Sequence, residues 1–266
     1  MSDAVLYAQE GPVVILTMNR PDVRNAIGDF AEIDHFVSLL ARASADRSVR
    51  AVILTGAGAA FAAGGNVKAM REKTGMFGGG AAAIRENYRR SVQHLAKALW
   101  AVEVPTIAAV NGPAVGQGCD LACLCDIRIA ARSAKFSVPF LKLGLIPGDG
   151  GAWLFPRVVG RSRAAELFYT GDMIDAETAA QWGLASRVVE DAALMDEAKA
   201  LALRIASNPP DVLRMTKRLL RDSEGASFET IMDLSSAMQS ICHQTEDHAE
   251  AIEAFFEKRP GDFKGR

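Results

Sequence analysis

The stretch that decides the fold of this 266-residue chain is residues 111–126, NGPAVGQGCDLACLCD. Residues 104–110, VPTIAAV, stand directly before it and are predicted to form a buried strand, because they are apolar and rich in β-branched side chains. After Gly118 the pattern turns helical. The first N–H groups of such a helix lack intrahelical acceptors, and glycines let a ligand approach them. This predicts an oxyanion-binding turn with Asp120 as a candidate acid or base. An ordinary strand-to-helix turn is the alternative.

A second strand followed by a glycine turn lies earlier in the chain. Residues 50–55, RAVILT, are predicted to form a strand, and residues 56–70, GAGAAFAAGGNVKAM, lead from it into a polar helix start. Two backbone donors from separate loops can stabilise a negatively charged carbonyl oxygen. Removal of one such donor typically costs roughly 3–4 kcal/mol of the activation barrier. The pair of turns therefore predicts an oxyanion hole more strongly than either turn alone.

Composition excludes several classes of protein. About half of the residues are hydrophobic (49%), which suffices for one large core. The formal net charge of −2 argues against general nucleic-acid binding. The longest uncharged run, residues 51–67, is broken by glycines and is too irregular to span a membrane. The N-terminal residues carry neither a basic leader nor an apolar signal core, so we expect a cytoplasmic protein.

Three of the four cysteines crowd together at Cys119, Cys123 and Cys125. No Cys-x-x-Cys pair occurs and no histidine is near, so no metal site is predicted. Cys119 at a helix start is a candidate nucleophile, with a packed thiol as the alternative. A dinucleotide fingerprint would need a third small residue at positions 61 and 121, where Phe61 and Leu121 stand.

The chain begins with a predicted hairpin, continues through mixed β and α segments and ends in helices. We expect a helix over residues 28–45, a single helix over residues 82–100, and a third glycine turn at residues 145–151. Residues 73–81, KTGMFGGGA, are predicted to lack regular structure and to form either a lid or a plain surface loop. From residue 164 onward nearly all of the chain is predicted to be helical.

Taken together, these residues resemble the crotonase superfamily, the enoyl-CoA hydratase/isomerase family. The resemblance runs in order over nearly the whole chain. It rests on residues 19–26, 61–70, 111–126, 143–148, 170–171, 180–185 and 254–259. It implies an α/β fold, a crotonase-like spiral of ββα units, with a helical C-terminal trimerisation region. We place the spiral core at residues 1–200 and the oligomerisation region at residues 201–266, as one folded unit that assembles as a homotrimer or a dimer of trimers.

The resemblance further implies an acyl-CoA thioester substrate, with coenzyme A as part of the substrate and no tightly bound cofactor. The backbone N–H groups of Gly65 and Gln117 match the family's oxyanion hole. At position 117 the family often has glycine or alanine, so Gln117 keeps the N–H and adds a side chain.

Five residues match positions that bind coenzyme A: Arg24, Ala26, Ala63, Lys68 and Lys258. Lys258 would act from a neighbouring subunit. A solvated surface charge is the alternative for Arg24, Lys68 and Lys258.

The chain departs from the family at its two catalytic glutamates. Asp120 stands at the first position and Phe140, expected in the acyl pocket, at the second. Because a phenyl ring cannot transfer a proton, the two-glutamate hydration mechanism is incomplete. Asp149 is a possible partner for Asp120 if it faces the pocket, with one carboxyl protonated and the other ionised. Its alternative is a helix cap.

Two functions follow as hypotheses. The first is an enzyme of the enoyl-CoA hydratase/isomerase family, a lyase or isomerase that works through a thioester enolate, with Asp120 as the leading proton-transfer residue. The second is a CoA-ester-binding or scaffolding protein that keeps the fold without the chemistry. No nucleic acid and no membrane is expected as a partner.

Overall fold

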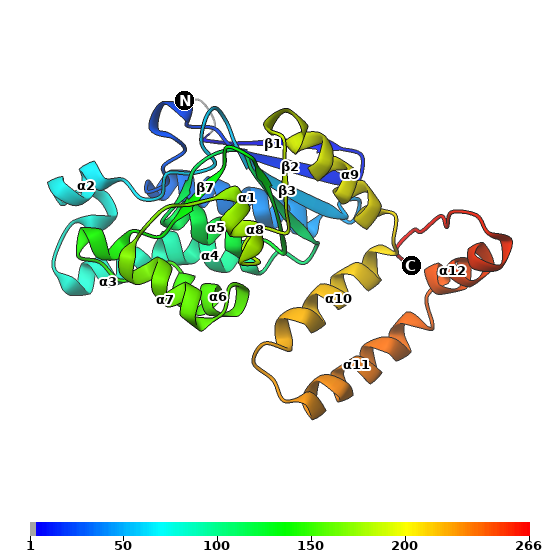
Figure 1. Cartoon of the computed structure of the whole chain (residues 1–266). Coiled ribbons are helices and arrows are strands. Elements are labelled where there is room, and N and C mark those ends of the chain that lie inside the picture. Colours follow the sequence, from blue (N-terminus) through cyan, green and yellow to red (C-terminus); the bar gives the residue numbers. More distant parts are fainter. Residues whose placement is uncertain (1–3) are drawn as a thin grey trace.

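The main layer of the protein is a six-stranded sheet (Figure 1). The computed structural model describes residues 4–266. In spatial order the strands are β1 (Val5–Glu10), β2 (Val13–Met18), β3 (Ala51–Gly56), β4 (Thr106–Val110), β6 (Ile127–Ala131) and β9 (Arg187–Val189). β1 and β2 form the predicted antiparallel hairpin, and every later neighbour pairs in parallel.

A second, smaller sheet makes the chain a spiral. It contains β5 (Ala114–Val115), β7 (Lys135–Ser137) and β8 (Ile174–Asp175). After β4 in the main sheet, the chain enters β5 in the small sheet and then α5 (Gln117–Leu124). After β6 it enters β7 and then α6 (Gly151–Val158). Each of these two turns thus gives one strand to each sheet and then a helix, as predicted for a spiral of ββα units.

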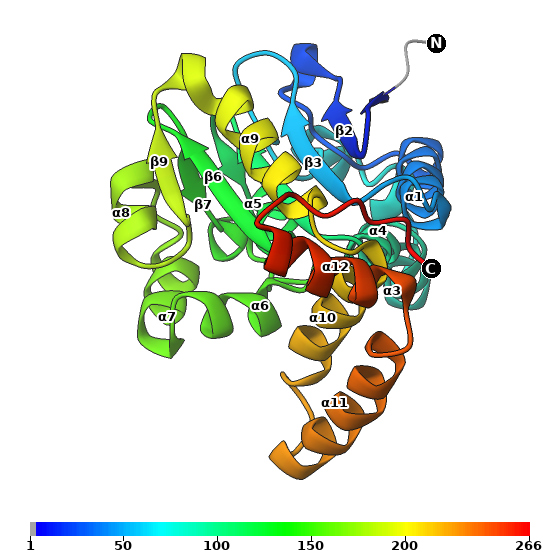
Figure 2. The ribbon, with the colours of Figure 1, turned by 90° about the vertical axis from the view of Figure 1, so that its right-hand side faces the viewer.

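Helices cover both faces of the main sheet, and both faces are accordingly apolar. One face packs against α9, through Ile53, Ile107 and Ile129 of the strands and Leu194 and Leu201 of the helix. The opposite face joins the larger core with α1, α4 and α5 (Figure 2). The remaining helices are α1 (Phe30–Ala45), α2 (Val67–Glu72), α3 (Ala81–Arg90), α4 (Val92–Trp100), α7 (Arg161–Thr170), α8 (Ala176–Gln181), α9 (Leu194–Ala206), α10 (Pro210–Asp222), α11 (Phe228–Cys242) and α12 (Glu246–Glu257).

Two predictions for residues 73–100 were wrong. The helix expected over residues 82–100 is broken between α3 and α4 at Ser91, whose backbone is not helical (φ −117°, ψ −105°) and whose hydroxyl donates to the Asn87 carbonyl at 2.5 Å. The segment expected to lack regular structure contains a 3-10 turn, Gly75–Phe77. This turn forms because Met76 is buried in the core and its carbonyl accepts from the Asn87 side chain at 3.1 Å.

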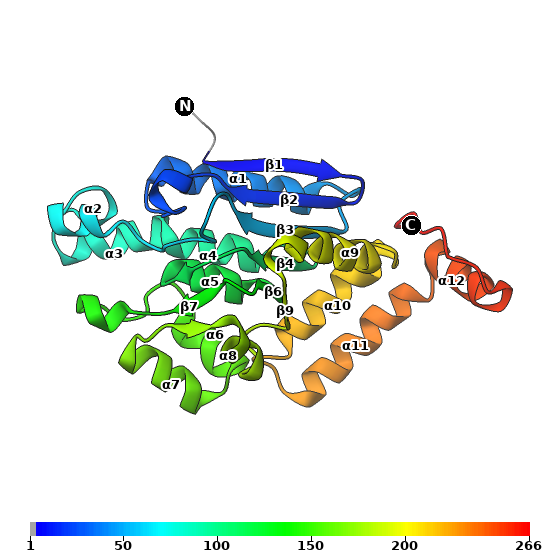
Figure 3. The ribbon, with the colours of Figure 1, turned by 45° about the horizontal axis from the view of Figure 1, so that its top comes forward.

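The C-terminal helices extend from one end of the spiral. Figures 1 and 3 show α10 and α11 as a hairpin that projects beyond the sheet, with α12 following the end of α11, away from the loop of the hairpin. The expected boundary at residue 200 falls inside α9, which packs on the main sheet. α10 is also tied to the core, because the buried Lys217 ammonium lies 2.7 Å from the Asp126 carboxylate and donates to the Val104 carbonyl at 2.6 Å. α9 and α10 are therefore both attached to the spiral core.

The two glycine turns meet where the small sheet begins. Ala62 forms a parallel bridge with Ala114, and the Val115 N–H donates to the Ala62 carbonyl at 2.9 Å. Gly118 passes so close to this carbonyl that a Cβ atom at position 118 would collide with it. The buried Asn25 side chain holds the first turn from the other side, where it donates to the carbonyls of Ala57 and Ala60 at 2.9 Å each.

Gly118→Ala should separate the two turns. We expect a loss of roughly 3 kcal/mol or more in the free energy of unfolding, because the obstructing atoms belong to the backbone and cannot rotate away. Gly225→Ala is the matched control, since a Cβ there meets open space at ordinary φ. Chemical denaturation of both variants measures the difference. Equal stability of the two variants would contradict this account of the junction.

Candidate active site

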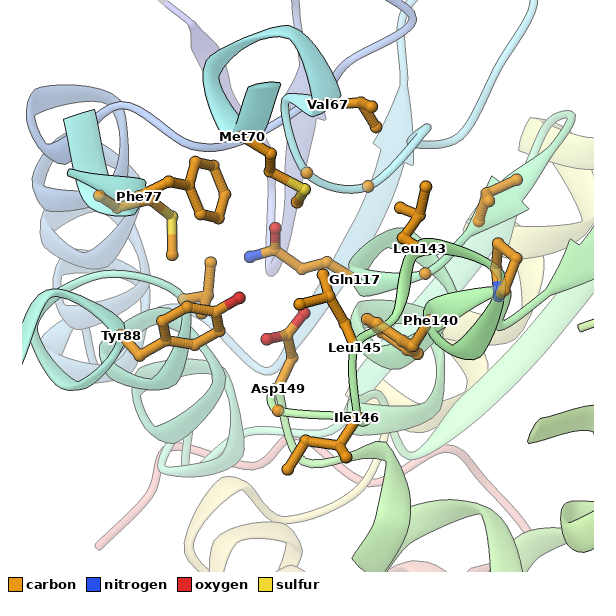
Figure 4. Close-up of a pocket in the computed structure, with 18 of the residues that line it drawn as sticks. Val67, Met70, Phe77, Tyr88, Gln117, Phe140, Leu143, Leu145, Ile146 and Asp149 are labelled. Atoms are coloured by element: carbon orange, nitrogen blue, oxygen red, sulfur yellow. The ribbon is translucent and has the colours of Figure 1, made fainter. Parts of the chain in front are cut away.

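A cavity of about 120 Å³ lies between the two glycine turns, α3 and the third glycine turn. Its volume is comparable to the roughly 150 Å³ cavity that accepts benzene inside a protein core. Most of the wall is apolar, and its larger side chains are Met70, Met76, Phe77, Phe140, Leu145 and Ile146 (Figure 4). The polar side chains on the wall are those of Tyr88, Gln117 and Asp149. An apolar pocket with a few convergent polar groups is typical of a small-molecule site.

Gly65 and Gln117, the two predicted oxyanion donors, both line this cavity. Gln117 is the first residue of α5, so its N–H has no intrahelical acceptor. Within residues 4–266, neither this N–H nor that of Gly65 is paired with a backbone or side-chain acceptor. Positive φ values at Gly64 (85°) and Gly116 (55°) turn the chain directly before each donor. Two unpaired backbone donors thus border one cavity.

Asp149 lies on the cavity wall, at the end of the third glycine turn (Figure 4). The residue that caps α6 is Gly150, with no side-chain hydrogen bond, so the structure favours the pocket-facing alternative over the helix cap. The Asp149 side chain is buried, and burial raises its pKa to about 6. At neutral pH the Asp149 side chain is therefore mostly ionised, and its carboxylate is a stronger base than that of an ordinary aspartate.

Asp120 lies behind the wall rather than on it. It is 1% exposed and is not among the residues that line the cavity. Its carboxyl packs against Gly151 at the start of α6. Burial first, and then the neighbouring Asp149 carboxylate, raise the pKa of Asp120 well above its usual value. The two aspartates are thus neighbours, as one hypothesis required, but only Asp149 reaches the space where a substrate would bind.

Two polar groups of the cavity were not predicted as functional. Tyr88 of α3 is half-buried, and burial together with the Asp149 charge raises the pKa of its phenol, so it stays protonated at neutral pH. The Gln117 side chain is 3% exposed and projects into the cavity (Figure 4). The glutamine within the glycine turn was a visible signal, whereas nothing in the helical pattern around Tyr88 distinguishes it from a surface tyrosine.

Phe140 lines the cavity, as expected of an acyl-pocket residue. It begins the 3-10 turn Phe140–Leu143, and its ring lies beside Gly116. A Cβ atom at position 116 would be 3.8 Å from the Phe140 ring. The aromatic ring thus occupies the wall next to the oxyanion donors, where it supplies apolar surface.

The candidate CoA-binding residues divide into two groups. Ala63 N–H donates to the Arg24 carbonyl at 2.8 Å, which places the loop of Arg24 and Ala26 against the first glycine turn. Lys68 is exposed on α2, next to the cavity residue Val67. Lys258 ends α12, at the opposite end of the molecule from α2 (Figure 1). The structure therefore brings four of the five near the cavity and leaves Lys258 of the same chain far away.

Neither a metal-binding cluster nor a membrane-spanning helix is found within residues 4–266. No group of three or more His, Cys, Asp or Glu side chains there is arranged to hold a metal ion. None of the helices in this part of the chain has the length and apolar character that a membrane crossing requires.

The known proteins that this chain matches are described as enoyl-CoA hydratases or as isomerases of CoA esters. A family model described as enoyl-CoA hydratase/isomerase matches residues 8–266. The 1,2-epoxyphenylacetyl-CoA isomerase of Escherichia coli (strain K12) is 38% identical over 267 residues, covering 100% of both chains. The short-chain-enoyl-CoA hydratase of Clostridium acetobutylicum is 36% identical over 266 residues, covering 98% of both. A crystal structure of enoyl-CoA hydratase from Bacillus anthracis matches with a TM-score of 0.92 and 32% identity, covering 99% of this chain and 100% of that one.

Asp149→Asn should stabilise the protein at neutral pH. The folded state raises the pKa of Asp149 from 3.8 to about 6, so folding takes up protons between these values and the wild type loses stability as pH rises through that window. The variant avoids this loss. Its advantage should be near zero below pH 4 and reach about 3 kcal/mol at pH 7 and above.

Thermal or urea unfolding at pH 4 and pH 8 measures this difference. The exposed Asp34→Asn, on α1, is the matched control and should show no pH-dependent gain. If Asp149→Asn were equally or less stable than the wild type at pH 8, burial of the ionised Asp149 carboxylate would not destabilise the folded protein.

Proposed function

The chain belongs to the enoyl-CoA hydratase/isomerase family, and on this premise we propose that it is an acyl-CoA isomerase in which Asp149 alone moves the proton. Membership of the family makes it an acyl-CoA enzyme, a lyase or an isomerase. The observation that carries the narrower proposal is that Asp149 supplies the single carboxylate on the wall of a mostly apolar cavity.

In the proposed reaction, the thioester carbonyl oxygen accepts hydrogen bonds from the backbone N–H groups of Gly65 and Gln117. When the α-carbon loses a proton, the electron pair of the broken C–H bond moves into the enolate and negative charge develops on this oxygen. Donors that are already oriented stabilise that charge without reorganisation. Both N–H groups border the cavity and lack other acceptors within residues 4–266, which supports this role.

Asp149 would accept the α-proton and return it at another carbon of the same acyl chain. One carboxylate suffices for this exchange, because the O–H bond formed in the first step is the bond broken in the second. A base with a pKa of about 6 is ionised at neutral pH and still basic enough to take a proton from carbon efficiently. The net result is movement of a double bond, with no atom gained or lost.

Hydration makes a different demand on the site. It requires one group to deliver a proton to the α-carbon while another activates the attacking water. Phe140 cannot transfer a proton, and Asp120 lies behind the wall with 1% of its surface exposed. The named relatives include both a hydratase and an isomerase, so it is the cavity that favours isomerisation here.

Asp120 therefore takes a supporting role in this proposal, in place of the leading role expected from the sequence. Burial and the nearby Asp149 charge raise the pKa of Asp120 well above its usual range, so the charged form of its carboxyl is disfavoured. A neighbouring carboxyl whose charged form is disfavoured opposes the ionisation of Asp149 less than an ionised one would. Two carboxylates so close together would each disfavour the ionisation of the other.

The CoA part of the substrate would enter past the rim formed by the first glycine turn. Arg24 and Lys68 are exposed there and carry the positive charge that suits the nucleotide phosphates. Lys258 can contribute only from another copy of the chain. Such an assembly, a homotrimer or a dimer of trimers, is supported by large apolar side chains exposed on the C-terminal helices: Phe228, Met232, Ile241, Phe255 and Phe256.

A 3-enoyl-CoA should be converted to its 2-enoyl isomer, and Asp149→Asn should abolish most of this turnover. We expect kcat to fall by about 100-fold to 10,000-fold, the usual contribution of a general base. Asp120→Asn should lose far less, and the affinity of Asp149→Asn for free CoA should match the wild type. Mass spectrometry and ultraviolet absorbance follow the product.

Rapid hydration of crotonyl-CoA by the wild type would contradict the isomerase proposal. Tight binding of every thioester with no conversion would instead indicate the non-catalytic scaffold.

The assembly should depend on the apolar side chains of α12. Phe255→Glu is expected to reduce the molar mass in solution toward that of the 28.4 kDa monomer, because it places a charge where a partner surface would bury a ring. Tyr169→Glu on α7 is the matched control, since Tyr169 (76%) is as exposed as Phe255 (77%). Light scattering coupled to gel filtration measures the mass. A monomeric wild type would contradict the proposed assembly.

A further inference from the structure

A groove of about 980 Å³ adjoins the active-site cavity, between α3 and the third glycine turn, and the proposed reaction does not use it. Phe77, Tyr88 and Leu145 line both the cavity and the groove (Figure 4). Gly148, which directly precedes Asp149, lines both as well. An acyl chain whose reacting carbons lie beside Asp149 can therefore extend into this groove.

Much of the groove wall is apolar. Its apolar side chains are those of Met70, Phe77, Ile84, Leu143, Leu145 and Ile146. Two of them are unusually exposed for their type, Leu143 at 49% and Ile146 at 80%. A hydrocarbon chain that lies on these side chains removes apolar surface from water, which favours its binding. The wall thus suits the methylene groups of an acyl chain.

The charged side chains on the groove wall all have the same sign. Among residues 4–266 they are Lys73, Arg85 and Arg89, and no carboxylate accompanies them on the wall. In this part of the chain neither Lys73 nor Arg85 forms a salt bridge, and Arg89 has only a 3.7 Å contact with Glu86 of its own helix. Three cations around one groove produce a positive potential that attracts an anion.

Helix stability does not account for this arrangement. Arg89 stands in the last turn of α3, where a positive charge complements the helix dipole. Arg85 stands in the middle of α3, where the dipole offers no such gain. Four residues separate it from Arg89, so the two like charges share one face of the helix and repel each other. An anion between them would remove this repulsion.

We propose that the groove binds the far end of an acyl chain that carries a terminal carboxylate, so that the preferred substrates are CoA thioesters of dicarboxylic acids. A guanidinium group presents a fork of N–H donors that matches the two oxygens of a carboxylate, and such charge-assisted hydrogen bonds are stronger than neutral ones. Arg85 and Arg89 are the principal donors in this proposal, and Lys73 adds positive charge.

The placement of the chain rests on the proposed function, in which Gly65 and Gln117 bind the thioester oxygen and Asp149 exchanges the proton. The acyl chain then continues past Leu145 and Ile146 into the groove. Its carboxylate lies beyond the carbons between which the double bond moves, so recognition of the carboxylate leaves those carbons free to react.

The phosphates of CoA are the other anions that the substrate carries. Their proposed path runs past the first glycine turn, at Arg24 and Lys68, and neither of these residues lines the groove. A decisive experiment must therefore separate recognition of the acyl carboxylate from recognition of CoA.

Pairs of saturated acyl-CoA thioesters make this separation without any need for turnover. The first members are glutaryl-CoA, adipyl-CoA and suberyl-CoA, which differ in chain length. The second member of each pair carries a terminal carboxamide in place of the carboxylate, so its size is nearly equal and its charge is absent. Calorimetry gives the two dissociation constants, and their ratio within one protein cancels the contribution of CoA.

We expect the wild type to prefer the carboxylate by about tenfold for at least one chain length, since several partly exposed ion pairs each contribute modestly. Arg85→Gln should reduce this ratio to about threefold, and the double variant Arg85→Gln, Arg89→Gln should bring it near one. Arg90→Gln is the matched control, because Arg90 is exposed on the same helix but does not line the groove. It should keep the wild-type ratio.

A wild type that binds both members of every pair equally, or prefers the carboxamide, would overturn the proposal. So would a preference for the carboxylate that survives in the double variant. A third contrary result is a double variant that binds free CoA and both members of each pair more weakly by the same factor, because the two arginines would then bind the phosphates of CoA.

Failure of this inference is distinguishable from failure of the isomerase proposal. The binding ratio does not depend on proton transfer, so the preference for the carboxylate should persist in Asp149→Asn. Loss of the preference in the double variant would support the inference even if Asp149 proved not to be the base. Conversely, isomerase activity without any preference for the carboxylate would overturn the inference alone.

Discussion

The site depends on the close approach of two backbone segments, the Ala62 carbonyl and the turn that runs from Val115 to Gly118. β3 and β4 are paired neighbours in the main sheet, and the hydrogen bond from Val115 N–H to the Ala62 carbonyl, with no side chain at Gly118, holds together the segments that follow them. Each strand is followed by a glycine turn, so this one contact sets Gly65 and Gln117 on the same cavity. The spiral of two sheets can be understood as the scaffold that holds this contact in place.

Burial then determines what the polar groups beside the contact can do. Asp149 and Asp120 are both removed from water, and their pKa values rise for that reason. Because only Asp149 reaches the cavity, the chemistry that we propose is one that a single carboxylate can complete. Phe140 fits this interpretation. It places an apolar ring on the cavity wall at the position that matches the family's second catalytic glutamate. Gln117 adds a buried carboxamide to the cavity wall at the same residue whose backbone N–H is a proposed donor to the thioester oxygen.

The strands and the two glycine turns could be predicted from local signals, namely apolar β-branched runs and the glycines that follow them. The spiral of ββα units was predicted from the resemblance to the crotonase superfamily. It left open whether Asp149 faces the pocket, since Asp after a glycine turn suits a cap equally well. It could not show that Asp120 lies behind the wall, because the side of α5 that faces the cavity depends on how α6 packs through Gly151. The break at Ser91 and the approach of Tyr88 to Asp149 arise from tertiary contacts with Met76 and Gly148, which no local pattern contains.

The central claim is that a lone carboxylate with a pKa near 6 exchanges the α-proton of a thioester held by two backbone donors. The most direct test is the rate of α-proton exchange of a saturated acyl-CoA in deuterated water, followed by nuclear magnetic resonance from pH 4.5 to pH 8. The account predicts a rate that rises with a single midpoint near 6 and then levels off, since only the ionised form of Asp149 accepts a proton. An exchange rate that is negligible or independent of pH over this range would contradict it.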